Sequence, residues 1–447
     1  MSDALPIPLR PDLDFYRTLA RDLQTAVADR QVRPFVERWA ARLGKQVDIG
    51  WYGERGISSE RVADWIERQW RRFADKQLGL EEPPSSIKLT DAQFFMAHIH
   101  DFPSWPRFAH HVEAMANADS LTVHFEAAAD AIVTGDIDTL RRLLREHPEL
   151  VRARSTRGHG STLLHYVSAN GVEDFRQHTP PNIVAITELL LDAGADVNAE
   201  SEAYGGKSTT LGLAATSIHP ERAGVQIPLL ELLLGRGADI EQRGQAGNQH
   251  SAIWGCLANG QGEAARFLAQ RGAPMNLAEA AGVGRLDVVK TCLDESGGLD
   301  ESSLRRQLED GFFYGCGYGH AAIVDYFLER GADASTRNAR GETGLHWALY
   351  GPHLDVVDVL LRHGAPVDAR DAQQGTALDW AVNGWAHASD QVERERLAEA
   401  AARLVRAGAP LTLSWYDQNE RRRQSLKLAR SDSRMRTLLA ERLCAEG

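Results

Sequence analysis

The stretch Leu189–Val197, which reads LLLDAGADV, decides the fold because its pattern returns along the chain. A leucine-rich turn of helix is followed by Gly-Ala, one further residue and an apolar residue. Recurrence at a period of about 20–50 residues is typical of a stacked repeat array, in which each unit buries its apolar face against its neighbours. The Gly-Ala pair returns at Gly237, Gly272, Gly331, Gly364 and Gly408.

The spacing and the opening residues of the repeat indicate its secondary structure. Gly331 and Gly364 are 33 residues apart. The unit between them opens with Thr343–Ala348, TGLHWA, and continues with the apolar segment His353–Leu361. Threonine at the start can cap a first helix, and glycine after the leucine run supplies the left-handed backbone that ends a second helix. Each unit is therefore expected to be a pair of helices.

These features resemble ankyrin repeats, whose unit of about 33 residues is a β-turn followed by two antiparallel helices that open with T-P-L-H. The resemblance implies an all-α repeat solenoid, a helix-turn-helix array with short β-turns. About eight units of this length extend from Phe125 to Ser414, and a degenerate helix pair at Leu426–Leu443 is expected to cap the array. The longer intervals before Gly237 and Gly408 indicate units that carry extra residues.

Residues 1–120 do not repeat and are expected to form an N-terminal helical domain, followed by the array and its cap at residues 121–447. Thr90 and Gln93 have the spacing of a capping box at the start of one helix. The segment Asp91–Pro106 resembles the helical leader of a group of bacterial ankyrin proteins, which implies that it packs against the first repeat. The expected helices are 13–27, 32–43, 61–78, 91–100 and 105–114, with a loop at 47–57 and a break at 81–86.

The composition is that of a globular chain with an acidic balance. Of 447 residues, 43% are hydrophobic and 25% are charged, and the net charge is −12. A nucleic-acid partner is not expected, because phosphate binding needs a basic surface. No apolar stretch approaches the length of about 18 residues that a membrane span needs, and no secretory signal opens the chain, so no membrane partner is expected. The four dispersed cysteines are typical of a reducing compartment, and a cytoplasmic location is expected.

Two local patterns suggest a ligand site without meeting its requirements. Gly205–Ser208, GGKS, matches the end of a phosphate-binding loop, but Ser201 stands where that motif needs its first glycine. His98 and His100 point to different faces of a helix and match no metal-ligand spacing. No cofactor and no metal are therefore expected.

Two units carry polar insertions where other units have a short turn. Residues 170–182 interrupt unit two, and residues 217–226 interrupt unit three. Turns of adjacent units stack at one edge of an ankyrin array, so the insertions are expected to touch and to form a wall beside the concave face. His219 and Glu173 are the candidate catalytic groups, and Arg176 is a candidate anion-binding group. The alternative is a polar network in which the insertion residues satisfy one another.

Aromatic residues supply a second candidate site. In ankyrin repeats, positions after the first helix face the concave groove, and several of them hold large side chains in this chain. Tyr318 and Tyr350 are expected to be exposed there, as aromatic anchors of a binding surface are, whereas large residues at other positions can equally fill the core. The expected partner-binding residues are Tyr166, Asn170, Glu173, Arg176, Tyr204, His219, Trp254, Tyr314, Tyr318, Trp347, Tyr350 and Trp380.

The sequence supports two functions from different classes. The ankyrin resemblance implies a non-catalytic binding module that holds a protein or peptide partner on the concave face. The polar insertions support the alternative, a small-molecule-binding protein or enzyme whose pocket is walled by units two and three. The sequence leaves open whether the chain catalyses a reaction and which partner or substrate it takes.

Overall fold

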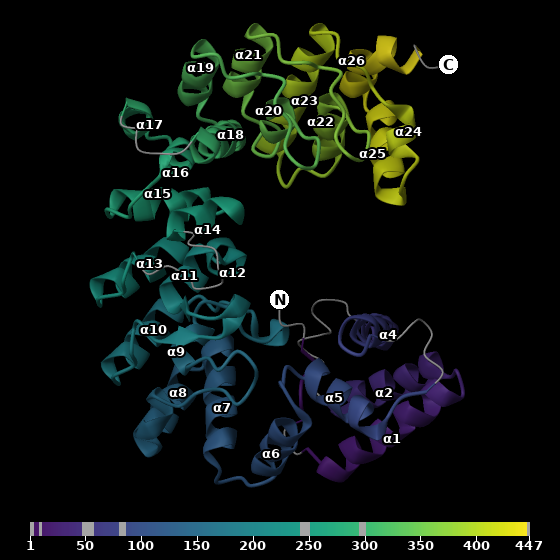
Figure 1. The fold of residues 1–447 in the computed structure, drawn as a ribbon, viewed down its shortest axis with the longest axis vertical. Helices are drawn as coiled ribbons and strands as arrows, with labels where there is room; N and C mark the ends of the chain where they lie inside the picture. Colours follow the sequence, from purple (N-terminus) through teal and green to yellow (C-terminus); the bar gives the residue numbers. More distant parts are fainter. Residues whose placement is uncertain are drawn as a thin grey trace. The chain divides into compact units, whose positions relative to one another are not determined.

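The chain is helical throughout its described parts (Figure 1). It divides into two compact units, Met1–Ala264 and Ala265–Gly447, and each is described by itself. The architecture is an all-α repeat solenoid with an N-terminal helical region, as the repeat pattern predicted. The loop expected at 47–57 lies outside the described residues, as does most of the break at 81–86. The computed structural model describes residues 4–8, 11–46, 58–79, 86–241, 251–294 and 301–444.

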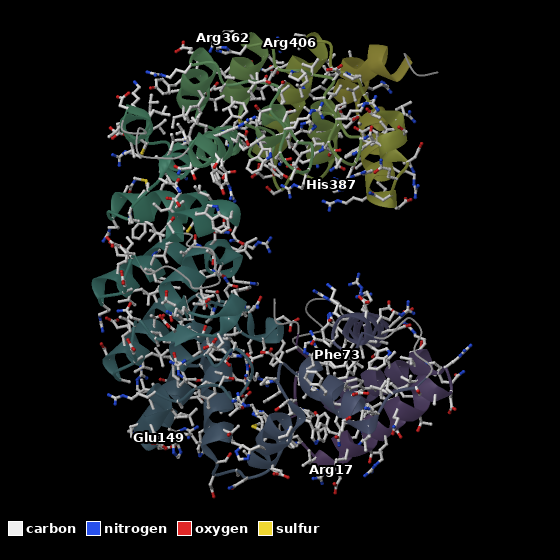
Figure 2. All side chains as sticks on the ribbon, in the orientation of Figure 1. Arg17, Phe73, Glu149, Arg362, His387 and Arg406 are labelled. Carbon is white, nitrogen blue, oxygen red and sulfur yellow. The ribbon has the colours of Figure 1, made fainter. Side chains whose placement is uncertain are left out.

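The N-terminal helices of the first unit pack around aromatic rings. Phe73 and Phe95 lie edge to face, with ring centroids 5.3 Å apart (Figure 2). Ser58 caps one of these helices, because its side chain accepts a hydrogen bond from the N–H of Arg61. Among the described residues, the N-terminal helices are α1 (Leu13–Ala28), α2 (Val32–Gln46), α4 (Ser59–Lys76), α5 (Leu89–Ile99) and α6 (Trp105–Met115).

The start of α5 differs from the prediction. The helix begins at Leu89, and the carboxylate of Asp91 accepts a hydrogen bond from the backbone N–H of Lys88 at 2.9 Å. The capping box expected between Thr90 and Gln93 is therefore wrong. Asp91 stands three residues after Lys88, the spacing at which a side chain reaches back to a free N–H.

Helix pairs of the repeat follow in the first unit. The second pair is widened by the 3₁₀ turns η2 (Asp174–Arg176) and η3 (Ala203–Gly205) and by the strands β1 (Glu200–Ser201) and β2 (Ser208–Thr209), which pair antiparallel. The short helix α12 (Ile218–Arg222) fills the insertion of the third pair. The remaining elements are α7 (Leu121–Thr134), α8 (Ile137–Glu146), η1 (Pro148–Val151), α9 (Leu163–Tyr166), α10 (Ile183–Asp192), α11 (Thr210–Ala215), α13 (Gln226–Gly235) and α14 (Ala252–Ala258).

The second unit continues the repeat and ends in a helical cap. Its apolar core runs from Leu277 to Leu439 through every helix pair. The cap expected at Leu426–Leu443 corresponds to α25 and α26. The elements after α14 are α15 (Gly262–Gln270), which contains the unit boundary, α16 (Leu277–Val283), α17 (Leu286–Asp294), α18 (Glu301–Gly317), α19 (Ala321–Glu329), α20 (Gly344–Trp347), α21 (Leu354–Arg362), α22 (Ala377–Ala386), α23 (Gln391–Arg406), α24 (Leu413–Tyr416), α25 (Glu420–Ser431) and α26 (Ser433–Cys444).

The residues that open and close a repeat act as their chemistry predicted. Gly331 and Gly364 have φ angles of 91° and 75°, the left-handed conformation that ends a helix at low cost. At the start of α20, His346 Nδ1 accepts a hydrogen bond from the N–H of Thr343. Its Nε2 donates to the carbonyl oxygen of Gly375 at 3.2 Å. The histidine therefore joins one unit to the next.

Candidate functional site

Five buried ionisable side chains meet where the insertion of the second repeat packs on α7, and we call them the buried ion cluster. They are Glu126 of α7, Arg157 and His159 of the loop before α9, and Glu173 and Arg176 of the insertion. Arg157 Nε lies 2.5 Å from Glu173 Oε1, and Arg176 Nη1 lies 2.8 Å from Glu126 Oε2. Crossed contacts of 3.4 Å and 3.6 Å bring each arginine to the other carboxylate.

The electrostatics of the buried ion cluster fix its charge state. Burial alone would raise the pKa of Glu173 and of Glu126, but the two arginines outweigh burial and hold both pKa values below the usual range. The Glu173 side chain is 0% exposed, and its Oε2 atom has no hydrogen-bond partner among the described residues. A charged, paired and enclosed carboxylate lacks the access and the basicity of a general base. This environment favours the polar network over an acid–base role for Glu173.

The buried ion cluster also attaches the N-terminal helices to the repeats. Arg157 donates to the carbonyl oxygen of His100 at 2.9 Å, and the N–H of Gly158 donates to the carbonyl oxygen of Asp101 at 2.7 Å. The backbone N–H of Ala4 donates to Asp174 of the insertion at 3.3 Å. The loop before α9 and the polar insertion of the second repeat therefore hold the N-terminal region in place together.

Other predicted residues of the first unit fall into two pairs. The Tyr166 hydroxyl is buried and donates to Glu173 at 3.3 Å. The Tyr204 hydroxyl donates to Asn170 at 2.6 Å, and the Tyr204 side chain is 54% exposed. Asn170 in turn donates to Thr216, the residue before the insertion of the third repeat, at 3.2 Å.

The two remaining candidates of this unit lie on helices of later repeats. His219 is half-buried in α12, and Trp254 is partly buried in α14, where Ser251 caps the helix. Their roles as site residues stay predictions.

In the second unit, three predicted aromatic residues form a continuous wall. The rings of Trp347 and Tyr350 lie 5.8 Å apart and those of Tyr350 and Trp380 lie 5.4 Å apart, both edge to face. Each indole is fixed by a carboxylate: Trp347 Nε1 donates to Glu342 at 3.0 Å, and Trp380 Nε1 donates to Asp371 at 2.9 Å. The aromatic wall is therefore held in position before any partner arrives.

A cavity of about 540 Å³ is lined by Tyr350 and Trp380 of this wall, and we call it the repeat groove. Tyr350 is 55% exposed in it, as expected, whereas Tyr318 is half-buried and Tyr314 is buried at 8% exposure. The Arg422 guanidinium also lines the cavity and lies 3.9 Å from the centre of the Trp415 ring. The lining residues are Arg340, Glu342, Leu349, Tyr350, Asp371, Ala372, Gln373, Trp380, Asn383, Gly384, Glu393, Leu397, Trp415 and Arg422.

Sequence reasoning missed the charged residues of the repeat groove. Glu342 directly precedes Thr343 and Asp371 stands five residues before Thr376, so both lie in the turns that open a repeat but at different repeat positions. Arg422 lies in α25 of the cap, where no repeat position pointed to it. His387, at the end of α22 (Figure 2), does not line the groove but contacts a residue that does. Its Nδ1 lies 2.9 Å from the carbonyl oxygen of Asn383.

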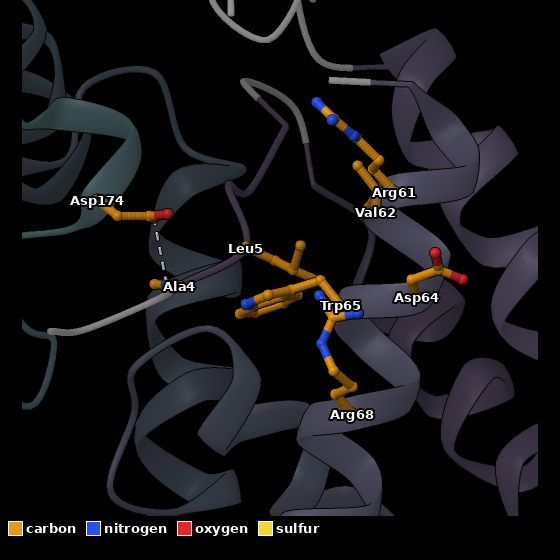
Figure 3. A pocket seen from close by; sticks show the side chains of 8 residues that line it. All are labelled: Ala4, Leu5, Arg61, Val62, Asp64, Trp65, Arg68 and Asp174. Atoms are coloured by element: carbon orange, nitrogen blue, oxygen red, sulfur yellow. Dashed lines mark hydrogen bonds between the residues drawn. The ribbon is translucent and has the colours of Figure 1, made fainter. Parts of the chain in front are cut away.

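A second cavity, of about 400 Å³, lies in the first unit between α4 and the N-terminal segment (Figure 3). Trp65 and Leu5 form its apolar side, and Arg68 reaches toward the Trp65 ring. Its acidic residues are already engaged, since Asp64 pairs with Arg33 and Asp174 accepts from the N–H of Ala4. The complete lining is Ala4, Leu5, Arg61, Val62, Asp64, Trp65, Arg68 and Asp174.

Among the residues whose placement is described, no three His, Cys, Asp or Glu side chains gather as metal ligands would. Within the same ranges, no helix has both the length and the apolar character needed to cross a bilayer.

Comparison with known proteins identifies the repeat. A family model for ankyrin repeats, in three copies, matches residues 312–390. No curated protein matches the chain. The matched segment contains the aromatic wall of Trp347, Tyr350 and Trp380. Residues 312–390 therefore belong to the ankyrin-repeat family.

Proposed function

We propose that the chain is a binding module and that the repeat groove holds a peptide segment of a protein partner. Ankyrin repeats are generally protein-interaction modules. The observation that carries the proposal is Tyr350, a large aromatic side chain that is 55% exposed beside a cavity of about 540 Å³. Binding energy at interfaces concentrates on such aromatic anchors, and pockets of about 300–1,000 Å³ suit a few side chains.

The rigidity of the aromatic wall supports the same proposal. Trp380 and Trp347 are each held by a hydrogen bond to a carboxylate, so their rings lose little freedom when a partner binds. Preorganisation of this kind improves affinity because fewer side chains must be ordered on association. The turns that carry Glu342 and Asp371, the residues Leu349 and Tyr350 after α20, and the helix α22 line the same cavity.

A selection from a random peptide library on the immobilised full-length chain tests the proposal. Peptides that bind are expected to lose affinity at least about tenfold when Tyr350→Ala removes the anchor. Tyr204→Ala is the matched control, because Tyr204 has nearly the same exposure, 54%, but lies in the other unit. Equal losses in both variants, or no binder sensitive to Tyr350→Ala, would overturn the proposal.

A further inference from the structure

We infer that the side chain held in the repeat groove is positively charged, an arginine or a lysine of the bound peptide. This inference rests on the proposed function and narrows it to one class of partner chemistry. It is carried by the combination of aromatic faces with buried carboxylates on the same wall of the groove.

The aromatic wall has the electronic character that attracts a cation. Trp380 donates its indole N–H to Asp371, and Trp347 donates to Glu342. Each such hydrogen bond shifts electron density toward the ring, and the face of an indole is already the strongest aromatic partner for a cation. Tyr350 adds a second ring at 84° to Trp380, and the face of either ring, unlike its electropositive edge, attracts a cation.

Both the number of carboxylates around the groove and the burial of two of them favour a bound cation. The Glu342 side chain is 5% exposed and Asp371 is 6% exposed, whereas the Arg340 side chain that pairs with Glu342 is 65% exposed. Solvent screens an exposed charge far more than a buried one, so the buried carboxylates dominate the potential within the groove. Glu393 contributes a third carboxylate to the lining.

The positive charge of Arg422 would favour an anion in the groove. Its guanidinium, however, is already engaged by neighbouring side chains. Its guanidinium stacks on Trp415 at 3.9 Å and donates to the side-chain oxygens of Gln373 and Gln418. These contacts hold the guanidinium against the Trp415 ring and engage two of its nitrogen atoms with amide oxygens. The overall charge of −12 also attracts a basic peptide during encounter.

The test compares peptides that differ only in charge. Library peptides that require Tyr350 are expected to contain arginine or lysine. Replacement of that residue by its neutral counterpart, citrulline for arginine or norleucine for lysine, is expected to weaken binding about tenfold, measured by fluorescence anisotropy. Enrichment of acidic peptides whose binding is lost in Arg422→Gln would overturn the inference while leaving the peptide-binding function intact.

A variant of the wall separates charge from shape. Glu342→Gln keeps an acceptor for Trp347 and removes the negative charge. It is expected to weaken binding of the arginine peptide about tenfold and to leave the citrulline peptide unchanged. Glu329→Gln, an exposed position of α19, removes the same charge outside the groove and is expected to have little effect. If no peptide requires Tyr350 at all, the proposed function fails; if neutral and charged peptides respond alike to Glu342→Gln, the inference alone fails.

Discussion

Glu173 Oε1 and Arg157 Nε lie 2.5 Å apart, and the two side chains are 0% and 1% exposed. Removing one partner of a buried ion pair leaves an uncompensated charge and costs about 3–5 kcal/mol. Glu173→Ala is therefore expected to lower the free energy of unfolding of the first unit by about that amount, measured by urea denaturation followed by circular dichroism. Glu221→Ala, an exposed change in the other insertion, is the control and is expected to change it by less than about 0.5 kcal/mol. Similar values for both variants would contradict the structural role of the pair.

Tyr350 is expected to contribute to binding and little to stability. Its side chain is 55% exposed, so Tyr350→Ala is expected to change the free energy of unfolding by no more than about 0.5 kcal/mol. Tyr318 is half-buried and its ring lies 6.4 Å from that of Tyr314, so Tyr318→Ala is expected to cost more. Thermal denaturation of both variants measures the difference. A large loss in Tyr350→Ala would show that this ring belongs to the core.

Two buried histidines predict a loss of stability in mild acid. Burial lowers the pKa of His100 to about 3 and that of His111 to about 4, from an ordinary value of 6.5. Below pH 6.5 the unfolded chain takes up these protons and the folded chain does not, so stability is full above pH 6.5 and falls as the pH drops. Between pH 6.5 and 5 each histidine accounts for about 2 kcal/mol.

Denaturation midpoints at pH 7 and pH 5 measure this effect. His111→Asn is expected to reduce the pH dependence, whereas His110→Asn, at the exposed neighbouring position, is expected to leave it unchanged. Glu126 and Glu173 do not interfere in this window, because their pKa values are lowered and they stay charged. An unchanged midpoint at pH 5 would count against buried neutral histidines.

Gly375 is expected to tolerate no side chain. A Cβ atom there would lie 2.5 Å from Nε1 of Trp415, a buried ring that cannot move aside easily. Overpacking of this kind costs about 1–3 kcal/mol, and Gly375→Ala is also expected to shift the tryptophan fluorescence. Gly235→Ala is the control, since nothing lies within 4 Å of a Cβ at that helical position. A fully stable Gly375→Ala variant would show that the Trp415 ring has room to shift.

The repeat could be predicted from the sequence because each unit carries its own signals. The glycine that ends a helix and the threonine that starts one act locally, and their spacing sets the fold. The candidate site was only partly predictable. Glu173 and Arg176 stood out as polar residues of an insertion, but Glu126 and Arg157, which neutralise them, lie in segments that look like ordinary parts of a repeat.

The remaining features depend on distant residues. The repeat groove is lined both by Tyr350 of a repeat and by Arg422 of the cap, and the second cavity is lined by Leu5 and Trp65. No periodic pattern connects such positions, because they meet only after the chain has folded. The prediction of the α5 capping box was wrong because two residue pairs, Thr90–Gln93 and Lys88–Asp91, have the same spacing near one helix start.

The contacts of Arg157 and Gly158 with the carbonyl oxygens of His100 and Asp101 have a consequence for how this protein can change. A chain shortened to begin after residue 120 would leave the Arg157 guanidinium without one acceptor and open to solvent beside Glu173. The N-terminal helices and the loop before α9 are therefore expected to depend on each other for folding. Exchange of whole repeats with other arrays is expected to be tolerated within residues 312–390. Between residues 100 and 176, the same exchange is expected to prevent folding.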